Sequence, residues 1–209
     1  MPKLVDHVSY RKHLLVQSFD LFARRGYSAL TMRQVAEALE VSTGTLYHYF
    51  PTKEALFQQL VEEVTQQTLF AAKSQVQEHA TLEERLMELF RFLAEHEEEL
   101  RKQFLVILDY YQHRDLYGSN ARAILSIGAD RYAQAVKEYV GLPDPQLCSL
   151  LQNQIDGLLT WRMIRGTTVP FIEQARPFVE MLAHYAQPTS SPTEKHSGSC
   201  KKAEQHEER

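Results

Sequence analysis

The sequence predicts an all-α protein of about nine helices, in which a small N-terminal unit joins a larger helical body. Apolar residues recur every three or four positions along most of the chain, and no run alternates in the manner of a β-strand. Glycine, proline and capping residues separate the helical stretches. A chain of 209 residues is long enough to bury a core in each of two such parts.

The N-terminal unit contains three predicted helices. The first runs from about Val8 to Arg25, where Gly26 serves as a C-terminal cap. Thr31 begins the second helix, which ends in a tight break at Val41–Ser42. The third is short and covers about residues 43–50. Two short helices joined by a tight break are the pattern of a helix-turn-helix, whose second helix reads DNA in the major groove.

The third helix has side chains that suit a DNA surface. Leu46 and Phe50 lie four residues apart, so both can pack inward. The other side chains are small, hydroxyl-bearing or aromatic, and they suit phosphate oxygens and base edges. They are Thr43, Gly44, Thr45, Tyr47, His48 and Tyr49. Lys53 stands in the first turn of the following helix, where the helix dipole favours an acid, and this indicates an external phosphate. The alternative is that the two tyrosines merely pack between helices.

The run GYSALTMRQVAEALEVSTGTLYHYFPTKEALF closely resembles the DNA-binding domain of the tetracycline-repressor (TetR) family of bacterial regulators. The resemblance covers about residues 8–60. It implies that Arg33, Thr43, Thr45 and Tyr49 approach base edges, that Thr31, Tyr47 and Lys53 contact phosphates, and that Gly44 allows close backbone contact. His48 stands one place behind the usual base-reading position, so its contact with DNA stays open. Beyond residue 60 the resemblance is one of architecture.

The remaining helices are expected in the C-terminal part of the chain. They cover about residues 53–73, 81–93, 98–113, 120–140, 145–165 and 170–186. Thr52 caps the helix over 53–73, which links the two parts, and Thr81 opens the next with a capping box. Ser119 or Asn120 should cap the helix that ends near residue 140. Glu97–Glu99 is expected to be a solvated corner or a helix start. Pro177 should bend or interrupt the last helix.

These elements suggest three regions. Residues 1–52 form the helix-turn-helix DNA-binding domain, and residues 53–186 form a helical domain for effector binding and dimerisation. Residues 187–209 are rich in Pro, Ser, Lys, Glu and His, and are expected to be a disordered polar tail.

Composition narrows the location and the class of protein. The net charge is −4, but residues 1–60 carry seven Lys and Arg against five acids, so the basic charge is concentrated where DNA would bind. No apolar run is long enough to span a membrane, and the first residues lack a secretory apolar region. With only two cysteines, a reducing cytoplasm is the expected location. We expect no membrane partner, metal, cofactor or catalytic site, because the histidines are scattered and no catalytic or phosphate-binding motif occurs.

The last two helices carry the apolar stripes expected at a dimer interface. Few later elements remain to cover these stripes, and paired across a two-fold axis they would form a four-helix bundle. The family resemblance implies the same arrangement, while an intramolecular core is the alternative. The candidate interface residues are Leu147, Leu151, Ile155, Leu158, Phe178, Val179 and Leu182.

The helical body of this family encloses a pocket for a small molecule, so the resemblance also implies an effector site. An aromatic and apolar lining would suit a lipophilic effector, either a drug-like cation or an acyl chain. The candidate lining residues are Phe90, Phe104, Ile107, Leu108, Tyr111, Asp156, Trp161 and Met163. Asp109 and Arg162 are further possible polar anchors.

Together these features predict a homodimeric repressor that binds an inverted-repeat operator in double-stranded DNA and is released by a small lipophilic effector. A TetR-like activator and a helical protein-interaction module without DNA binding are the alternatives. An oxidation sensor acting through Cys148 is disfavoured, because the folded part contains a single thiol.

Overall fold

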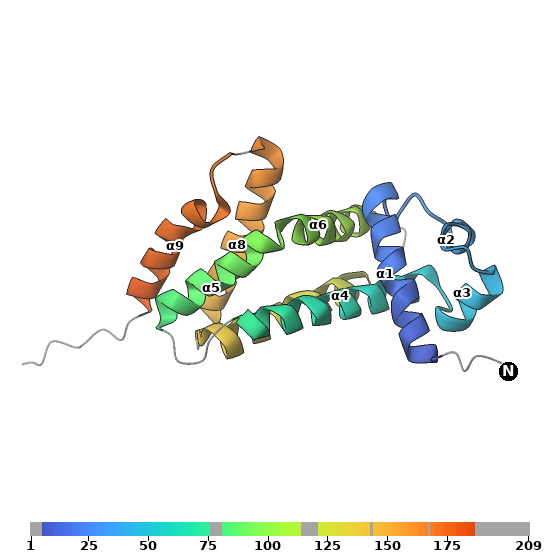
Figure 1. The fold of residues 1–209 in the computed structure, drawn as a ribbon, viewed down its shortest axis with the longest axis horizontal. Helices are drawn as coiled ribbons and strands as arrows, with labels where there is room; N and C mark the ends of the chain where they lie inside the picture. The colour runs from blue at the N-terminus through green and yellow to red at the C-terminus, as the bar shows by residue number, and fades with distance from the viewer. Residues whose placement is uncertain (1–5, 76–80, 114–120, 143, 167, 187–209) are drawn as a thin grey trace, which may run out of the picture.

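The computed structural model describes residues 6–75, 81–113, 121–142, 144–166 and 168–186 (Figure 1). Within these ranges the regular structure is entirely helical, so the predicted all-α class is confirmed. The helices are α1 (His7–Arg25), α2 (Met32–Ala38), α3 (Thr43–Tyr49), α4 (Lys53–Gln75), α5 (Leu82–Glu95), α6 (Glu97–Gln112), α7 (Ala121–Ala135), α8 (Pro145–Arg165) and α9 (Phe171–Tyr185). A π-helical segment, η2 (Val136–Val140), continues α7. The predicted cap at Ser119 or Asn120 and the tail lie outside the described residues.

Local capping sets most helix boundaries. Thr31 and Thr81 each form a full capping box, with Gln34 and Glu84 respectively, so both helices begin where a side chain satisfies the free backbone donors. Gly26 follows α1, as expected from a C-terminal glycine. Pro177 was expected to bend or interrupt the last helix, and the interruption is wrong, because α9 is continuous through this residue. Pro177 is exposed, and so is Glu173, whose carbonyl loses its helical donor, so water can solvate that carbonyl.

The helices form an elongated molecule (Figure 1). The head, formed by α1–α3, lies at one end, while α8 and α9 lie at the other. α4 and α6 run between the two ends, and each therefore contributes to both. None of the described helices is long and apolar enough to cross a lipid bilayer.

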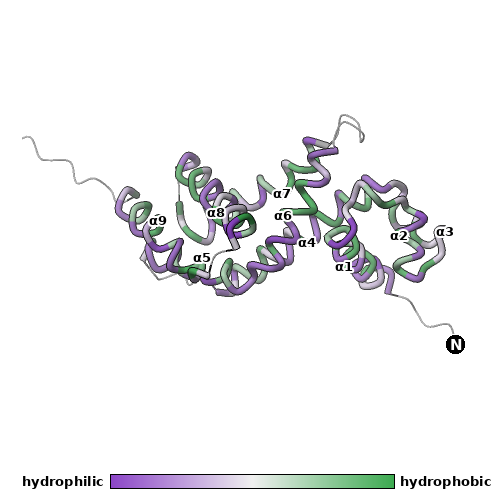
Figure 2. Tube along the Cα trace, turned by 90° about the horizontal axis from the view of Figure 1, so that it is seen from above, coloured by the Kyte–Doolittle hydropathy of each residue, from purple (hydrophilic) through white to green (hydrophobic). Residues whose placement is uncertain are grey.

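Two hydrophobic cores follow this division. The body core joins α5, α8 and α9, whereas the head core joins α1–α4 and also includes Val106 and Tyr110 from α6 and Ile124 from α7. Tyr110 stacks on Phe57 of α4, with ring centroids 4.0 Å apart. In Figure 2, hydrophilic and hydrophobic residues alternate along the helices, as expected of helices that bury one side. The head is therefore completed by side chains from far along the sequence.

Candidate nucleic-acid interface and effector cavity

The turn between α2 and α3 has the geometry of a Schellman motif. The backbone N–H of Val41 donates to the Ala36 carbonyl at 3.0 Å, and that of Glu40 donates to the Glu37 carbonyl at 3.1 Å. Glu40 adopts a left-handed conformation, with φ of 56°, at the position where glycine is usual. The side chain of Ser42 then accepts from the Thr45 N–H at 2.9 Å and begins α3. These bonds fix the orientation of α3 relative to α2.

α3 has one buried side and one exposed side. Leu46 and the following Phe50 are both 0% exposed, and both belong to the head core. The side chains of Thr43, Tyr47 and His48 are exposed, as is Gly44. A Cβ at Gly44 would meet only the Ser42 hydroxyl at 3.8 Å, so this point of the helix is open to a close backbone approach. The Thr45 hydroxyl is hydrogen-bonded to Ser42 at 2.8 Å, and Thr45 is half-buried.

Tyr49 differs from the outward orientation predicted for it. Its side chain is half-buried, and its ring lies 5.6 Å from the ring of Tyr10 on α1. Its hydroxyl is hydrogen-bonded to Nδ1 of His7 at 2.8 Å. Helical spacing could not have indicated this, because the contacts lie on α1, some 42 residues earlier. Tyr49 therefore attaches α3 to α1, whereas Tyr47 is free of such packing at 47% exposure.

The other candidate DNA contacts surround α3. Arg33 is exposed on α2, and Thr31 is exposed with its hydroxyl engaged by Gln34 at 2.9 Å. Lys53 is half-buried, with Nζ 4.0 Å from the centroid of the Tyr27 ring. Burial lowers the pKa of Lys53, while the nearby acids Glu54 and Asp109 raise it. The position of this lysine thus has an explanation within the protein, in addition to the phosphate that the sequence indicated.

A largely apolar cavity of about 260 Å³ lies between the head core and the body core, and residues of both cores line it. α4, α5, α6, α7, η2 and α8 provide most of its walls, and Phe19 of α1 also lines it. Three predicted residues, Phe104, Ile107 and Asp156, line it. Polar side chains that the sequence pattern did not indicate also line it, namely Thr68, Gln103, Tyr132 and Gln152. In the sequence, Tyr132 follows two small residues, Gly128 and Ala129, at helical spacing. This spacing was the available signal that Tyr132 lines a cavity.

The other predicted lining residues lie elsewhere, so these assignments are corrected. Leu108, Tyr111 and Trp161 are exposed, by 42%, 51% and 51%. Phe90 belongs to the body core, where its ring faces those of Phe171 and Phe178. Met163 is half-buried away from the cavity. Helical periodicity separates apolar from polar sides, but it does not indicate which apolar side faces a cavity and which faces a packed core.

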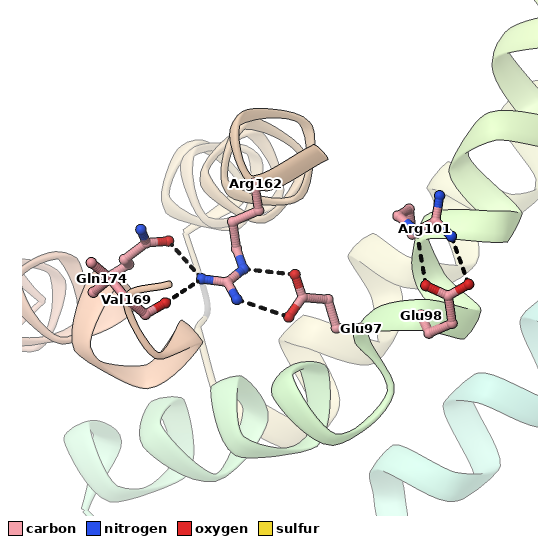
Figure 3. Close-up of polar contacts among 6 residues, drawn as sticks. All are labelled: Glu97, Glu98, Arg101, Arg162, Val169 and Gln174. Atoms are coloured by element: carbon pink, nitrogen blue, oxygen red, sulfur yellow. Dashed lines mark hydrogen bonds and ion pairs between the residues drawn. The ribbon is translucent and has the colours of Figure 1, made fainter. Parts of the chain in front are cut away.

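Arg162 and Asp109 have structural partners instead of facing the cavity. The Arg162 guanidinium donates from Nε and Nη2 to the Glu97 carboxylate at 2.6 and 3.1 Å (Figure 3). Its Nη1 donates to the Val169 carbonyl at 2.7 Å and to Gln174 Oε1 at 3.0 Å. Arg162 therefore joins the start of α6 to the end of α8 and to α9. Of the two expectations for Glu97–Glu99, the helix start is confirmed, because α6 begins at Glu97. Glu98 is exposed and pairs locally with Arg101 in Figure 3.

The predicted dimer residues also require a correction. Six of them are buried inside a single protomer, because α5 and the neighbouring helices cover the stripe that the sequence analysis had left uncovered. These are Leu151, Ile155, Leu158, Phe178, Val179 and Leu182. Leu147 is half-buried beside the same core. The exposed apolar side chains of α8 and α9 are instead Leu150, Trp161, Ile164, Met181 and Tyr185.

Those exposed side chains form what we call the outer face of α8 and α9. On α8, Leu150, Gly157, Trp161 and Ile164 follow one another at helical spacing. On α9, Met181 and Tyr185 do the same, at 56% and 74% exposure. A Cβ added at Gly157 would meet nothing within 4 Å. α8 is therefore apolar on two opposite sides, although its own protomer covers only one.

Cys148 is buried on α8, and its thiol donates to the Leu142 carbonyl at 3.2 Å. Burial raises the pKa of this thiol, so the reactive thiolate is disfavoured. This environment argues against the oxidation sensor considered above.

A helical head with an exposed, capped α3 defines the class of helix-turn-helix DNA-binding proteins. Comparison with known proteins supports this class. The sequence profile described as bacterial regulatory proteins of the tetR family matches residues 14–60. The HTH-type transcriptional repressor KstR2 of Mycobacterium tuberculosis is 29% identical over 179 residues, which cover 85% of this chain and 87% of the relative.

Solved structures share the fold. The transcriptional regulator FadR from Bacillus subtilis, in complex with stearoyl-CoA, matches with a TM-score of 0.65 at 19% identity, covering 82% of this chain and 97% of that one. A regulator from Saccharomonospora viridis in complex with choline matches with a TM-score of 0.64 at 20% identity, covering 86% of this chain and 97% of that one. Residues 14–60 therefore form a DNA-binding domain of the TetR-family type, and the protein is a DNA-binding transcriptional regulator.

Proposed function

We propose that this protein is a homodimeric repressor that binds an inverted-repeat operator and is released from it by a small lipophilic effector. The exposed side of α3 carries the proposal, since its side chains suit phosphates and bases and its buried side is fixed in the head core. Repression is favoured over activation because KstR2, which the chain resembles over most of its length, is named a repressor. The protein would act in the cytoplasm, where bacterial DNA lies.

We assign a separate role to each part of the helical structure. Residues 1–52 contain the DNA-binding unit, α4 links the two parts, and residues 53–186 hold the effector and the dimer contacts. In the proposed interface, Arg33, Thr43 and Thr45 read bases, Thr31, Tyr47 and Lys53 contact phosphates, and Gly44 permits close approach. Tyr49 and His48 would lie at the edge of this interface. Dimerisation would use the outer face of α8 and α9 in a four-helix bundle.

The effector site in this proposal is the cavity between the two cores. Its walls include α4 and α6, which both reach the head, so a ligand that favours one arrangement of these helices changes the spacing of the two α3 helices. The stearoyl-CoA and choline complexes of structurally similar regulators support a small-molecule ligand without indicating which one.

The decisive experiment is selection of bound duplexes from a random pool, followed by gel-shift titration of the selected sequence against shuffled duplex. We expect an inverted repeat, two protomers per duplex and binding that weakens with salt. A helical interaction module would select no sequence, and selection of a single half-site by a monomer would contradict the dimeric reading. The position of the operator relative to its promoter would separate repression from activation.

A further inference from the structure

The chemistry of the cavity narrows the class of effector, an inference that rests on the function proposed above. Among the described residues, the cavity wall is mostly aliphatic and aromatic, and it includes no Lys, Arg or His. Asp156 of α8 is the only acid among its lining residues. An apolar wall that contains one carboxylate is an asymmetric site.

Three polar side chains of the wall, one each from α4, α6 and α7, satisfy one another. The Tyr132 hydroxyl donates to Gln103 Oε1 at 3.2 Å, and Gln103 Nε2 donates to Thr68 Oγ1 at 3.1 Å. This chain of hydrogen bonds occupies both ends of the Gln103 amide. These three groups therefore do not require a ligand to complete them.

Asp156 has fewer hydrogen-bond partners than these three groups. Its Oδ1 accepts one long hydrogen bond, 3.3 Å, from Gln152 Nε2 one turn earlier on α8. No cation among the described residues forms an ion pair with it, since the ion pairs there join other side chains. The ionised carboxylate accepts hydrogen bonds and donates none, so the cavity presents an incompletely satisfied negative acceptor.

We infer that the effector is a lipophilic organic cation whose protonated amine donates to Asp156 while its hydrocarbon part fills the apolar cavity. A cationic donor compensates a half-buried carboxylate and forms the stronger, charge-assisted type of hydrogen bond. A carboxylate-bearing ligand would bring a second negative charge into the same low-dielectric space. A neutral alcohol could donate a hydrogen bond but would leave the charge in place.

A neighbouring hollow offers a competing site, which would suit an anionic head group instead of a cationic one. It shares Phe92, Leu100 and Gln103 with the cavity wall, and it carries His96 and Lys102 together with Asp20 and Glu99. An anionic head group could pair with Lys102 while its tail entered the cavity. The two acids in that hollow offset its positive charge, whereas the negative charge of Asp156 is not offset.

Three probes with the same chain test the inference: decylamine, decanol and decanoate, each below the concentration at which it aggregates. Binding to the full-length protein is measured by titration calorimetry and by the shift in melting temperature. We expect decylamine to bind best and decanoate worst. Asp156→Asn should reduce decylamine affinity by about 10- to 100-fold and leave decanol affinity unchanged. Asp130→Asn, which removes an exposed acid from α7, is the charge-matched control and should change none of the three.

Each other result would overturn the inference. Decanoate binding as tightly as decylamine, with loss of that binding in Lys102→Gln, would assign the head group to the neighbouring hollow. An equal loss of decylamine affinity in the Asp156 and Asp130 variants would show that the effect arises from overall charge and not from a contact with Asp156. Failure of all three probes to bind would reject an aliphatic amine as the ligand. Gel shifts on the same preparation report DNA binding separately, so a failed inference about the effector is distinguishable from a failed proposal of a DNA-binding regulator.

Discussion

Ser28 and Asp109 lie 81 positions apart in the sequence, and two hydrogen bonds join them. The Ser28 backbone N–H donates to Asp109 Oδ2 at 2.9 Å, and its hydroxyl donates to Oδ1 at 3.1 Å. Gly26, at φ of 81°, brings the backbone against the same carboxylate, since a Cβ there would lie 3.5 Å from Oδ2. The last turn of α6 is thus attached to the loop between α1 and α2, while the middle of α6 forms part of the cavity wall.

Replacing this carboxylate should weaken both the fold and the coupling between cavity and head. In Asp109→Asn the amide keeps one acceptor oxygen for the Ser28 N–H, but the second oxygen is replaced by a donor and the charge that strengthens both hydrogen bonds is lost. We expect the free energy of unfolding to fall by about 1–3 kcal/mol in urea titration. We also expect effector-induced release from DNA to become less complete in gel shifts. Asp130→Asn is the control, and equal behaviour of the two variants would contradict a special role for the Ser28–Asp109 contact.

Tyr47 and Thr45 should affect DNA binding differently. Tyr47→Phe removes an exposed hydroxyl proposed to contact a phosphate, so it should weaken binding to all duplexes by a similar factor. Thr45→Ala removes a group proposed to meet a base, so it should relax preference at one position, where a mismatch otherwise costs about 1–3 kcal/mol. Gel-shift titration against single-base operator variants measures both effects. A uniform loss in both variants would show that the two roles are assigned wrongly.

The two ion pairs of Figure 3 should differ in their contribution to stability. The Arg162 and Glu97 side chains are only 13% and 31% exposed, against 39% and 55% for Arg101 and Glu98. Arg162→Ala leaves Glu97 and the Val169 carbonyl without this donor, and we expect a loss of about 2–4 kcal/mol. Arg101→Ala should change stability by less than about 1 kcal/mol. Urea unfolding of both variants at one salt concentration makes the comparison, and similar losses would contradict it.

The outer face of α8 and α9 should control the oligomeric state. Ile164 is 71% exposed in the protomer, so Ile164→Glu should leave the protomer folded and prevent dimer formation. Phe70→Glu makes a similar change at a 78% exposed position on α4, and it should leave the dimer intact. Light scattering after size exclusion measures the mass, and circular dichroism checks the fold. A dimeric Ile164→Glu variant would place the interface elsewhere.

Stability should depend on pH through Asp156. Burial raises the pKa of Asp156, and the Gln152 hydrogen bond only partly opposes this. A raised pKa in the folded state means that the folded protein holds this proton more tightly than the unfolded chain does. Ionisation of Asp156 therefore reduces stability as the pH rises through the folded pKa, and the penalty is absent below the unfolded value of about 3.9. Asp156→Asn should be more stable than the wild type at neutral pH, and this difference should shrink toward about pH 4 in urea unfolding. A difference that grows in acid would contradict a raised pKa of Asp156.

Much of the head could be predicted from sequence because its signals are local. Capping at Thr31, the break before Ser42 and the inward spacing of Leu46 and Phe50 each depend on a few adjacent residues. The exposure of Tyr47 follows from the same spacing. Tyr49 does not, because its half-buried position depends on His7 and Tyr10, which α1 brings against α3.

The sequence by itself determined the all-α class and the helix-turn-helix, because capping residues and helical periodicity act over one or two turns. The resemblance to the TetR family likewise depends on one local run of residues. Only the tertiary structure decided which apolar side of α8 meets its own protomer, which residues surround the cavity, and that Asp109 and Arg162 connect helices. A periodic pattern identifies the apolar sides of a helix without identifying what covers each one. That assignment depends on how distant helices pack, and therefore on contacts between residues such as Ser28 and Asp109.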